Sequence, residues 1–226
     1  MKTSVHNYSN KKCPDRIFGK IKKIGANWKW TIIDKIREEM TGFNDDQKYK
    51  HLRKRGEQPA IVLILESPHS NEFNSSGKPI APAMGVSGQN IYKYFCDIIN
   101  GASSGNKQTA NNLNALVSFL NNNAGKEICV YIVNSVQYQC SLGIKPICHI
   151  IKESNWVDEW FAGPDFDERC NILNKEAFFI NLCTSGVFVP MKEMVKERLN
   201  ALGITDNDCE GPHPSSWNRL KKIEFK

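Results

Sequence analysis

Residues 60–68 read Ala-Ile-Val-Leu-Ile-Leu-Glu-Ser-Pro. The first six form a continuous apolar run, which is typical of a parallel strand covered on both faces. Similar runs predict strands over 129–136 and 177–184, and apolar residues at helical spacing predict helices over 87–100, 109–122, 148–161, 191–202 and 216–222. This alternation predicts an α/β fold, a three-layer α/β/α sandwich around a short, mainly parallel central sheet.

Three polar residues that could carry chemistry occur at the ends of apolar runs or in a turn. Glu66 comes directly after the first run, Asn134 lies near the end of the second, and His213 lies in a turn near the end of the chain. Ligands of open α/β sheets bind beyond the carboxyl ends of the strands. We therefore expect these three side chains at one candidate site. Each also has a plainer interpretation, as a capping carboxylate, an Asx turn and a simple His-Pro turn.

Four short motifs occur in a fixed order along the chain. They are Leu-Glu-Ser-Pro-His at 65–69, Gly-Lys-Pro-Ile at 77–80 with Ser-Gly-Gln at 87–89, the strand-end Asn134, and His-Pro-Ser at 213–215. Their order resembles the uracil-DNA glycosylase superfamily, whose members flip a base out of DNA and cleave its N-glycosidic bond. The resemblance spans roughly residues 60–222. The cysteine pairs that hold an iron–sulfur cluster in some branches are absent.

The resemblance implies a role for each matched residue. Glu66 would orient water, His213 would donate a hydrogen bond to the base as negative charge builds, and Ser67 stands where the best-known branch has its water-orienting Asp. The base would be held by Asn134, Pro68, His69 and Ile80, the last in place of a stacking aromatic residue. Contacts to DNA would come from Gly85, Ser87, Gly88, Gln89, Ser215, Trp217 and Arg219.

The departures at Ser67 and Ile80 argue against ordinary uracil repair. We expect a monofunctional DNA glycosylase acting on a modified pyrimidine, a function that suits defence against phage DNA. Three alternatives stay open: a repair glycosylase for uracil or a deaminated base, a non-catalytic DNA-binding protein, and a hydrolase of free nucleosides. No lysine in the matched motifs is placed to form a Schiff base, so lyase activity is not expected, and no cofactor is expected.

Positive charge is concentrated in the first quarter of the chain. The net charge is +6, and residues 1–58 carry 15 Lys and Arg against 7 Asp and Glu. Such an excess suits DNA as a partner, although a solvated helical face is the plainer interpretation. A rough apolar pattern over 28–40 predicts that residues 1–58 are a basic, mostly helical extension. The motif resemblance implies that residues 59–226 form the catalytic domain.

The eight cysteines include no C-x-x-C pair. Cys129 and Cys183 lie inside apolar runs and are expected in the core. This usage predicts free thiols in a reducing cytoplasm, with no metal site. No apolar run is long enough to span a membrane, and the first residues contain no apolar signal segment. We expect no obligatory protein partner.

Overall fold

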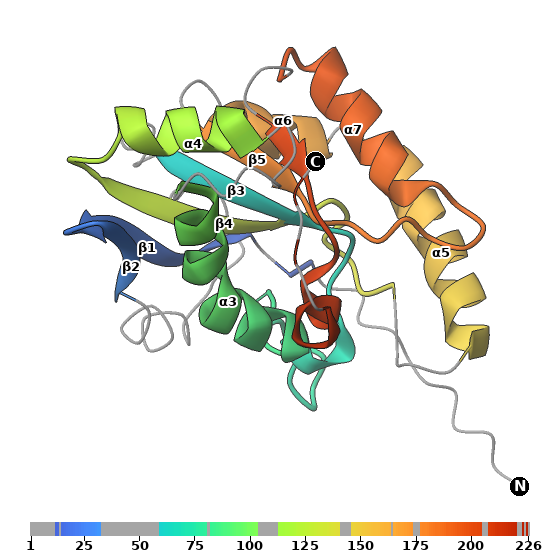
Figure 1. Cartoon of the computed structure of the whole chain (residues 1–226). Helices are drawn as coiled ribbons and strands as arrows, with labels where there is room; N and C mark the ends of the chain where they lie inside the picture. The colour runs from blue at the N-terminus through green and yellow to red at the C-terminus, as the bar shows by residue number, and fades with distance from the viewer. Residues whose placement is uncertain are drawn as a thin grey trace, which may run out of the picture.

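The computed structural model of the protein describes residues 12–13, 15–32, 59–80, 82–103, 113–140, 146–163, 165–173, 177–204, 208–220, 223 and 225. Within these residues six strands form one sheet in the order β2-β1-β4-β3-β5-β6 (Figure 1). Strands β4, β3, β5 and β6 run parallel, whereas β1 is antiparallel to both β4 and β2. The predicted α/β class with a mainly parallel sheet is confirmed. The strands are β1 (Arg16–Ile24), β2 (Asn27–Ile32), β3 (Ala60–Leu65), β4 (Glu127–Asn134), β5 (Ala177–Asn181) and β6 (Asp208–Glu210).

Helices lie on both faces of this sheet (Figure 1). One core cluster joins the sheet to α3 and α4, and a second joins its other face to α5, α6 and α7. The connection from β3 to β4 therefore uses one face, and the connections from β4 to β5 and from β5 to β6 use the other, as right-handed crossovers require. The helices are α3 (Val86–Ser103), α4 (Leu113–Asn122), α5 (Pro146–Phe161), α6 (Asp165–Leu173) and α7 (Met191–Ala201), with 3₁₀ helices η2 (Ser70–Glu72) and η3 (Pro214–Arg219).

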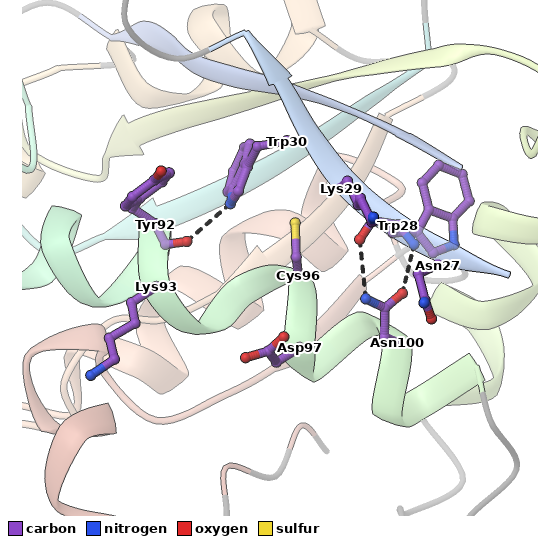
Figure 2. A pocket seen from close by; sticks show the side chains of 9 residues that line it. All are labelled: Asn27, Trp28, Lys29, Trp30, Tyr92, Lys93, Cys96, Asp97 and Asn100. Carbon is purple, nitrogen blue, oxygen red and sulfur yellow. Dashed lines mark hydrogen bonds between the residues drawn. The ribbon is translucent and has the colours of Figure 1, made fainter. Parts of the chain in front are cut away.

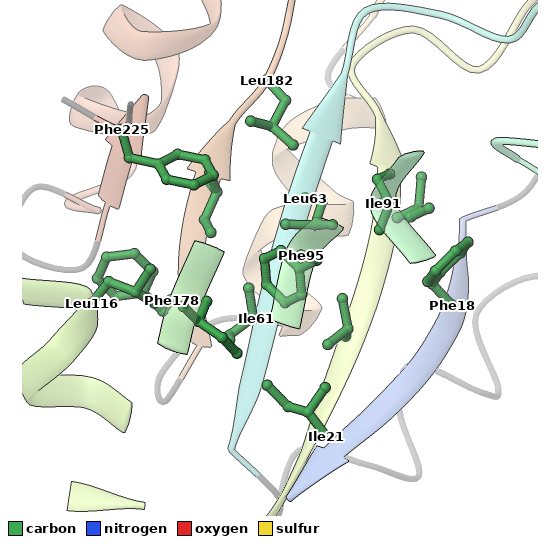
Figure 3. Packing of buried hydrophobic residues seen from close by; sticks show 14 of the residues in the cluster. Phe18, Ile21, Ile61, Leu63, Ile91, Phe95, Leu116, Phe178, Leu182 and Phe225 are labelled. Atoms are coloured by element: carbon green, nitrogen blue, oxygen red, sulfur yellow. The ribbon is translucent and has the colours of Figure 1, made fainter. Parts of the chain in front are cut away.

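Strand β3 is the centre of the core, and all six of its residues are buried. Ile61 and Leu63 face the α3 side, where they pack with Phe95 and Phe178 (Figure 3). Val62 faces the α5 side. Burial on both faces explains why the sequence of this strand is apolar at every position. The strand is thus held rigidly, and so is the residue that follows it, Glu66.

The predicted helix across residues 28–32 is wrong. Trp28 and Trp30 lie in β2, which forms a hairpin with β1 through a turn at Gly25, and β1 pairs with β4. The two tryptophans are two positions apart, which is the period of a strand, so both face α3 while Lys29 is exposed. The described part of residues 1–58 therefore belongs to the same sheet as β3, β4 and β5. The rest of the predicted extension, including Ile33, Ile36 and Met40, lies outside the described residues.

Edge strand β2 is attached to α3 by polar contacts. The Asn100 side chain accepts a hydrogen bond from the Trp28 N–H at 2.7 Å and donates one to the Trp28 carbonyl at 3.0 Å. The indole N–H of Trp30 donates to the Tyr92 carbonyl at 3.0 Å. A surface pocket lies between the two elements (Figure 2). These contacts use the Asn100 amide and the Trp30 indole N–H, two of the polar groups that line it, and none of Glu66, Asn134 or His213 lines the pocket.

The C-terminal segment differs from its prediction. Residues 214–219 form the 3₁₀ helix η3 in place of an α-helix, beginning at Pro214. Trp217 is 1% exposed, donates its indole N–H to the Pro212 carbonyl at 2.8 Å and packs edge-on against Phe225. A side chain inside the core cannot touch DNA, so the predicted DNA contact of Trp217 is wrong. Trp217 instead anchors the turn that carries His213.

The described cysteines are free thiols, and Cys129 and Cys183 are buried, as the sequence predicts. Burial is also the main cause that raises the pKa of Cys140, to about 12. Among the described residues no helix has the length and apolar character needed to cross a membrane.

Candidate active site at the carboxyl edge of the sheet

The strand order changes direction at the carboxyl end of β3. The chain passes from β3 to its neighbour β4 and then crosses to β5 on the other side of β3. Such a reversal leaves an opening between the carboxyl ends of the strands, where open α/β sheets bind their ligands. Glu66 follows β3, Asn134 ends β4, Thr184 follows β5 and His213 follows β6. The structure therefore brings together the three predicted residues Glu66, Asn134 and His213.

The backbone of Glu66 is fixed by neighbours from two elements. Its carbonyl accepts hydrogen bonds from the Ser135 hydroxyl at 2.7 Å, the Trp156 indole N–H at 2.9 Å and the Val136 N–H at 3.1 Å. Ser135 and Val136 follow β4, and Trp156 lies on α5. Three donors on one carbonyl leave the start of this loop little freedom, so the carboxylate direction is set by the fold.

The Glu66 carboxylate is buried and has three donors around it. Lys152 forms an ion pair with Oε1, His213 Nε2 lies 3.2 Å from Oε2, and the Thr184 N–H points at Oε2 from 3.4 Å. Burial raises the pKa of this carboxyl, but the charge that His213 carries when it is protonated and the charge of Lys152 outweigh burial and lower the pKa to about 2. Glu66 is therefore ionised at every pH at which the protein would work.

His213 is held as a neutral imidazole. Burial is the main cause that lowers its pKa, and Lys152 and Lys192 lower it further against the opposing effect of Glu66. Its Nδ1 accepts the Ser215 N–H at 3.3 Å and lies 2.8 Å from the Ser215 hydroxyl. An accepting Nδ1 leaves the proton on Nε2, which then donates to Glu66. The sequence predicts a phosphate contact for Ser215, whereas here Ser215 fixes the tautomer of His213.

Because His213 is neutral, Lys152 is the cation that keeps Glu66 charged. Sequence reasoning missed this residue, since 86 positions separate it from its partner. One signal was present: Lys152 lies four residues before Trp156, on the same face of α5, and Trp156 is fully buried. A lysine on the buried stripe of a helix needs an anionic partner inside the protein.

Asn134 has an unusual position. Its side chain is 0% exposed, yet neither its Nδ2 nor its Oδ1 has a hydrogen-bond partner. An unsatisfied buried polar group costs about 1–3 kcal/mol, and most buried polar groups in native proteins are paired. Such an amide, at the end of the strand that pairs with β3, is suited to bind a planar ligand with adjacent donor and acceptor atoms.

The backbone of Asn134 is held by a buried ion pair below the site. Arg169 on α6 donates to both carboxylate oxygens of Asp15, at 2.7 and 3.0 Å, and to the Asn134 carbonyl at 2.8 Å. The Nη2 of Arg169 donates to the Ser135 carbonyl at 3.0 Å. Asp15 in turn accepts the Asn134 N–H at 3.3 Å. All main-chain groups of Asn134 are thereby used, so only its amide remains for a ligand.

The other residues predicted to hold the base lie on the loop after Glu66. Pro68 is buried, and Ser67 and His69 are half-buried. Burial and the charge of Lys152 lower the pKa of His69, while Glu66 opposes them, so His69 lies close to the charged pair. Ile80 is 41% exposed on the surface of this loop, with its N–H bonded to the Glu72 carbonyl at 2.7 Å. Their contacts with a base stay predictions.

The loop before α3 is shaped by an internal contact. A Cβ on Gly88 would lie 1.8 Å from the Ala83 carbonyl oxygen, and Ala83 itself has a positive φ of 55°. The absence of a side chain at Gly88 therefore serves packing within the loop, in place of the predicted close approach to DNA. Gly85 and Ser87 are half-buried and Gln89 is exposed, as is Arg219 on η3, and their DNA contacts stay predictions.

Glu72 carries a second buried carboxyl group near the site. Its Oε1 accepts the Ala83 N–H at 2.8 Å, and burial, the main cause, raises its pKa from an ordinary 4.5 to about 8 although the Ala83 N–H opposes this. The folded protein therefore keeps the Glu72 proton at neutral pH. This carboxyl supports the bend at Ala83 without adding charge next to Glu66.

The raised pKa of Glu72 predicts a pH-dependent loss of stability. Between pH 4.5 and 8 the folded state holds a proton that the unfolded state has released, so the stabilisation present below 4.5 is lost as the pH rises towards 8. We expect the free energy of unfolding of the wild type, relative to Glu72→Gln, to fall from pH 5 to pH 9. Denaturant titrations at several pH values measure this difference. The contributions of His213 and other titrating groups are the same in both proteins and therefore cancel. A constant difference would contradict the assignment.

Among the described residues no group of three or more His, Cys, Asp and Glu side chains is arranged to hold a metal ion. In comparisons with protein-family models, with curated proteins and with solved structures, the chain matches none. The functional interpretation therefore depends on the geometry of the site and on the motif resemblance.

Proposed function

We propose that the protein is a monofunctional DNA glycosylase that hydrolyses the N-glycosidic bond of a flipped, modified pyrimidine. The observation that carries this proposal is the Asn134 carboxamide, fully buried and unpartnered, on the strand paired with the one that Glu66 follows. A pyrimidine edge presents a donor and an acceptor side by side, and a carboxamide matches both. An enclosed amide also requires that the base leave the duplex before it is bound.

The charges of the site match those of the reaction. Breaking the bond leaves negative charge on the base and positive charge on the sugar. His213 Nε2–H is a donor for the base oxygen, and its neutral state avoids placing a second fixed cation next to Lys152. Glu66, kept ionised, stabilises the cationic sugar and orients water.

The two roles are coupled through one hydrogen bond. A carboxylate has about four acceptor positions, and three donors already approach Glu66. When His213 turns its Nε2–H from Glu66 to the base, an acceptor position on Oε2 becomes free for the attacking water. Binding of the base thereby prepares the carboxylate for the second substrate of the hydrolysis.

The site also supports hydrolysis without a lyase step. The amine of Lys152 is held in an ion pair with Glu66, and the amine of Lys192 donates a hydrogen bond to the Gly211 carbonyl. Water is therefore the proposed nucleophile. The absence of a stacking aromatic side chain at Ile80 supports a base with a bulky 5-substituent, as in modified phage DNA, over plain uracil.

The test is base release from defined DNA. Duplexes with uracil, 5-hydroxymethylcytosine and glucosylated 5-hydroxymethylcytosine are incubated with the protein, abasic sites are detected by alkaline cleavage, and the released base is identified by mass spectrometry. Glu66→Gln, which keeps the shape of the side chain, is the matched inactive variant. Free nucleosides of the same bases test the nucleoside-hydrolase alternative. Absence of abasic sites with every DNA would reject the proposal.

A further inference from the structure

A smaller pocket lies between the segment after β4, the end of α5 and the start of α6. Its volume is about 200 Å³, roughly the room that six waters take in the liquid. None of Glu66, Asn134 or His213 lines it. The pocket is therefore distinct from the candidate active site, and the chemistry of its own side chains decides what it can bind.

Gln137 lines this pocket with a buried amide whose oxygen is unused. Its side chain is 2% exposed, and among the described residues its Oε1 has no hydrogen-bond partner. Burial is the main cause that raises the pKa of Asp15, and hydrogen bonds from Arg169 and Gln137 oppose it. Only the amide nitrogen of Gln137 can donate to Asp15, so the oxygen is left over. Because buried acceptors in native proteins are mostly paired, this oxygen indicates a ligand with an N–H or O–H donor.

The charges around the pocket leave one carboxylate without a cation. Asp165 is paired with Lys12 at 3.2 Å and with Arg169 at 3.2 Å. Glu159, near the end of α5, also lines the pocket and is half-buried, but it forms no ion pair with any described residue. The two unused groups of the pocket are thus both acceptors, the Glu159 carboxylate and Gln137 Oε1. A ligand that satisfies them carries N–H donors and one positive charge.

The aromatic rings of the pocket also favour a cation. Lys12 Nζ lies 5.4 Å from the centre of the Tyr138 ring, so one ammonium group of the chain already lies over a ring here. Trp160 lines the pocket as well, is half-buried, and stacks on Trp156 with 4.9 Å between the ring centres. Tryptophan is the side chain that attracts cations most strongly. A planar cation can lie against such a ring while its N–H groups reach acceptors at its edge, which suits a guanidinium better than an ammonium.

We propose that this pocket binds a small organic cation of the guanidinium class, which donates N–H groups to the Glu159 carboxylate and to Gln137 Oε1 and lies against the Trp160 ring. The single charge of the ligand matches that of Glu159. Gln137 and Asn134 both bond Asp15, so the ligand also stabilises the buried ion pair that holds the Asn134 backbone. This inference does not depend on the function proposed above.

The experiment compares three compounds that share a butyl chain. Butylguanidine carries the proposed group, butylurea has a planar head of similar size without the charge, and butylamine has the charge without the planar head. Binding to the full-length protein is measured by titration calorimetry and by the melting temperature, which a ligand of the folded state raises. Glu159→Gln removes the charge and keeps the shape of the side chain. Its matched control is Glu168→Gln, an exposed position on α6 that does not line the pocket.

We expect butylguanidine to bind the wild type and to raise its melting temperature. Butylurea and butylamine should bind about 10-fold more weakly, and so should butylguanidine to Glu159→Gln, since one hydrogen bond to a charged group is worth at least this factor. Glu168→Gln should behave like the wild type. Gln137→Met, which removes Oε1, should also weaken binding. Glu159 is only half-buried, so its variant should fold, and it decides the question if Gln137→Met does not fold.

Absence of butylguanidine binding to the wild type would overturn the proposal, as would equal binding by Glu159→Gln. An equal loss in Glu159→Gln and Glu168→Gln would show a general effect of net charge and would also overturn it. Equal binding of butylamine or butylurea would reject the guanidinium class, because the planar head or the charge would then not be recognised. These readouts need neither DNA nor base release, so failure of the proposed function leaves them valid, and the reverse also holds.

Discussion

Replacing His213 by alanine should slow base release about 10²–10³-fold, the usual loss when one donor to developing negative charge is removed. The reason is geometric: His213 Nε2–H is aimed into the site and its tautomer is fixed by the Ser215 N–H. The rate should be measured with enzyme in excess over the duplex, so that product release does not limit it. Affinity for the duplex should change little, because the donor acts as the bond breaks.

Ser215→Ala is the matched control for this experiment. It removes the hydroxyl 2.8 Å from His213 Nδ1 but keeps the N–H that also faces this nitrogen. The imidazole should keep its tautomer, so the rate should fall far less than in His213→Ala. An unchanged rate in His213→Ala would remove His213 from the mechanism, and an equal loss in both variants would make the hydroxyl the important group.

The central strands could be predicted from the sequence because each is buried on both faces. Strands β3, β4 and β5 are therefore continuous apolar runs with sharp ends, and the polar residue after each run marks the site edge. Glu66 and Asn134 were found in this way, whereas His213 was found from the His-Pro-Ser motif. The prediction required only that parallel strands end at the same edge of the sheet.

Shorter and mixed elements could not be predicted in the same way. Strand β6 has only three residues, and the hairpin of β1 and β2 alternates lysines with aromatic residues, a pattern that resembles a basic helix. Helix α6 contains a fully buried arginine, Arg169, and a charged residue on the buried face interrupts the apolar pattern by which the helix could be recognised in the sequence. Its partner Asp15 is 154 positions away, and no local pattern indicates such a pair.

The site was predicted only in part for the same physical reason. A residue at a strand end is placed by the strand, whereas the charge that acts on it comes from wherever another element packs. Lys152 reaches Glu66 from α5, and Glu153 fixes the loop after β5 from the same turn. For Trp217 the error was to assign a DNA contact to a residue because it lies next to a motif, whereas its side chain packs in the core.

Replacing Lys152 by methionine should have the largest effect on stability and should change the pH dependence of the reaction. Removing one partner of a buried ion pair costs about 3–5 kcal/mol, because the other charge stays buried without compensation. Burial would then dominate the pKa of Glu66 and raise it. The wild-type rate should be flat across neutral pH, since Glu66 is fully ionised, whereas the Lys152→Met rate should fall as the pH is lowered.

Two further variants separate the electrostatic role from packing. Lys152→Arg keeps the cation and should restore most of the stability and the flat pH profile. The double variant Lys152→Met with Glu66→Gln removes the uncompensated charge, so it should be more stable than Lys152→Met alone while staying inactive. Thermal unfolding and single-turnover rates from pH 5 to 9 measure both effects. If Lys152→Met kept a flat profile, another cation would have to hold Glu66 ionised. Among the described residues, His213, His69 and Lys192 are the other basic groups that are coupled to this carboxylate.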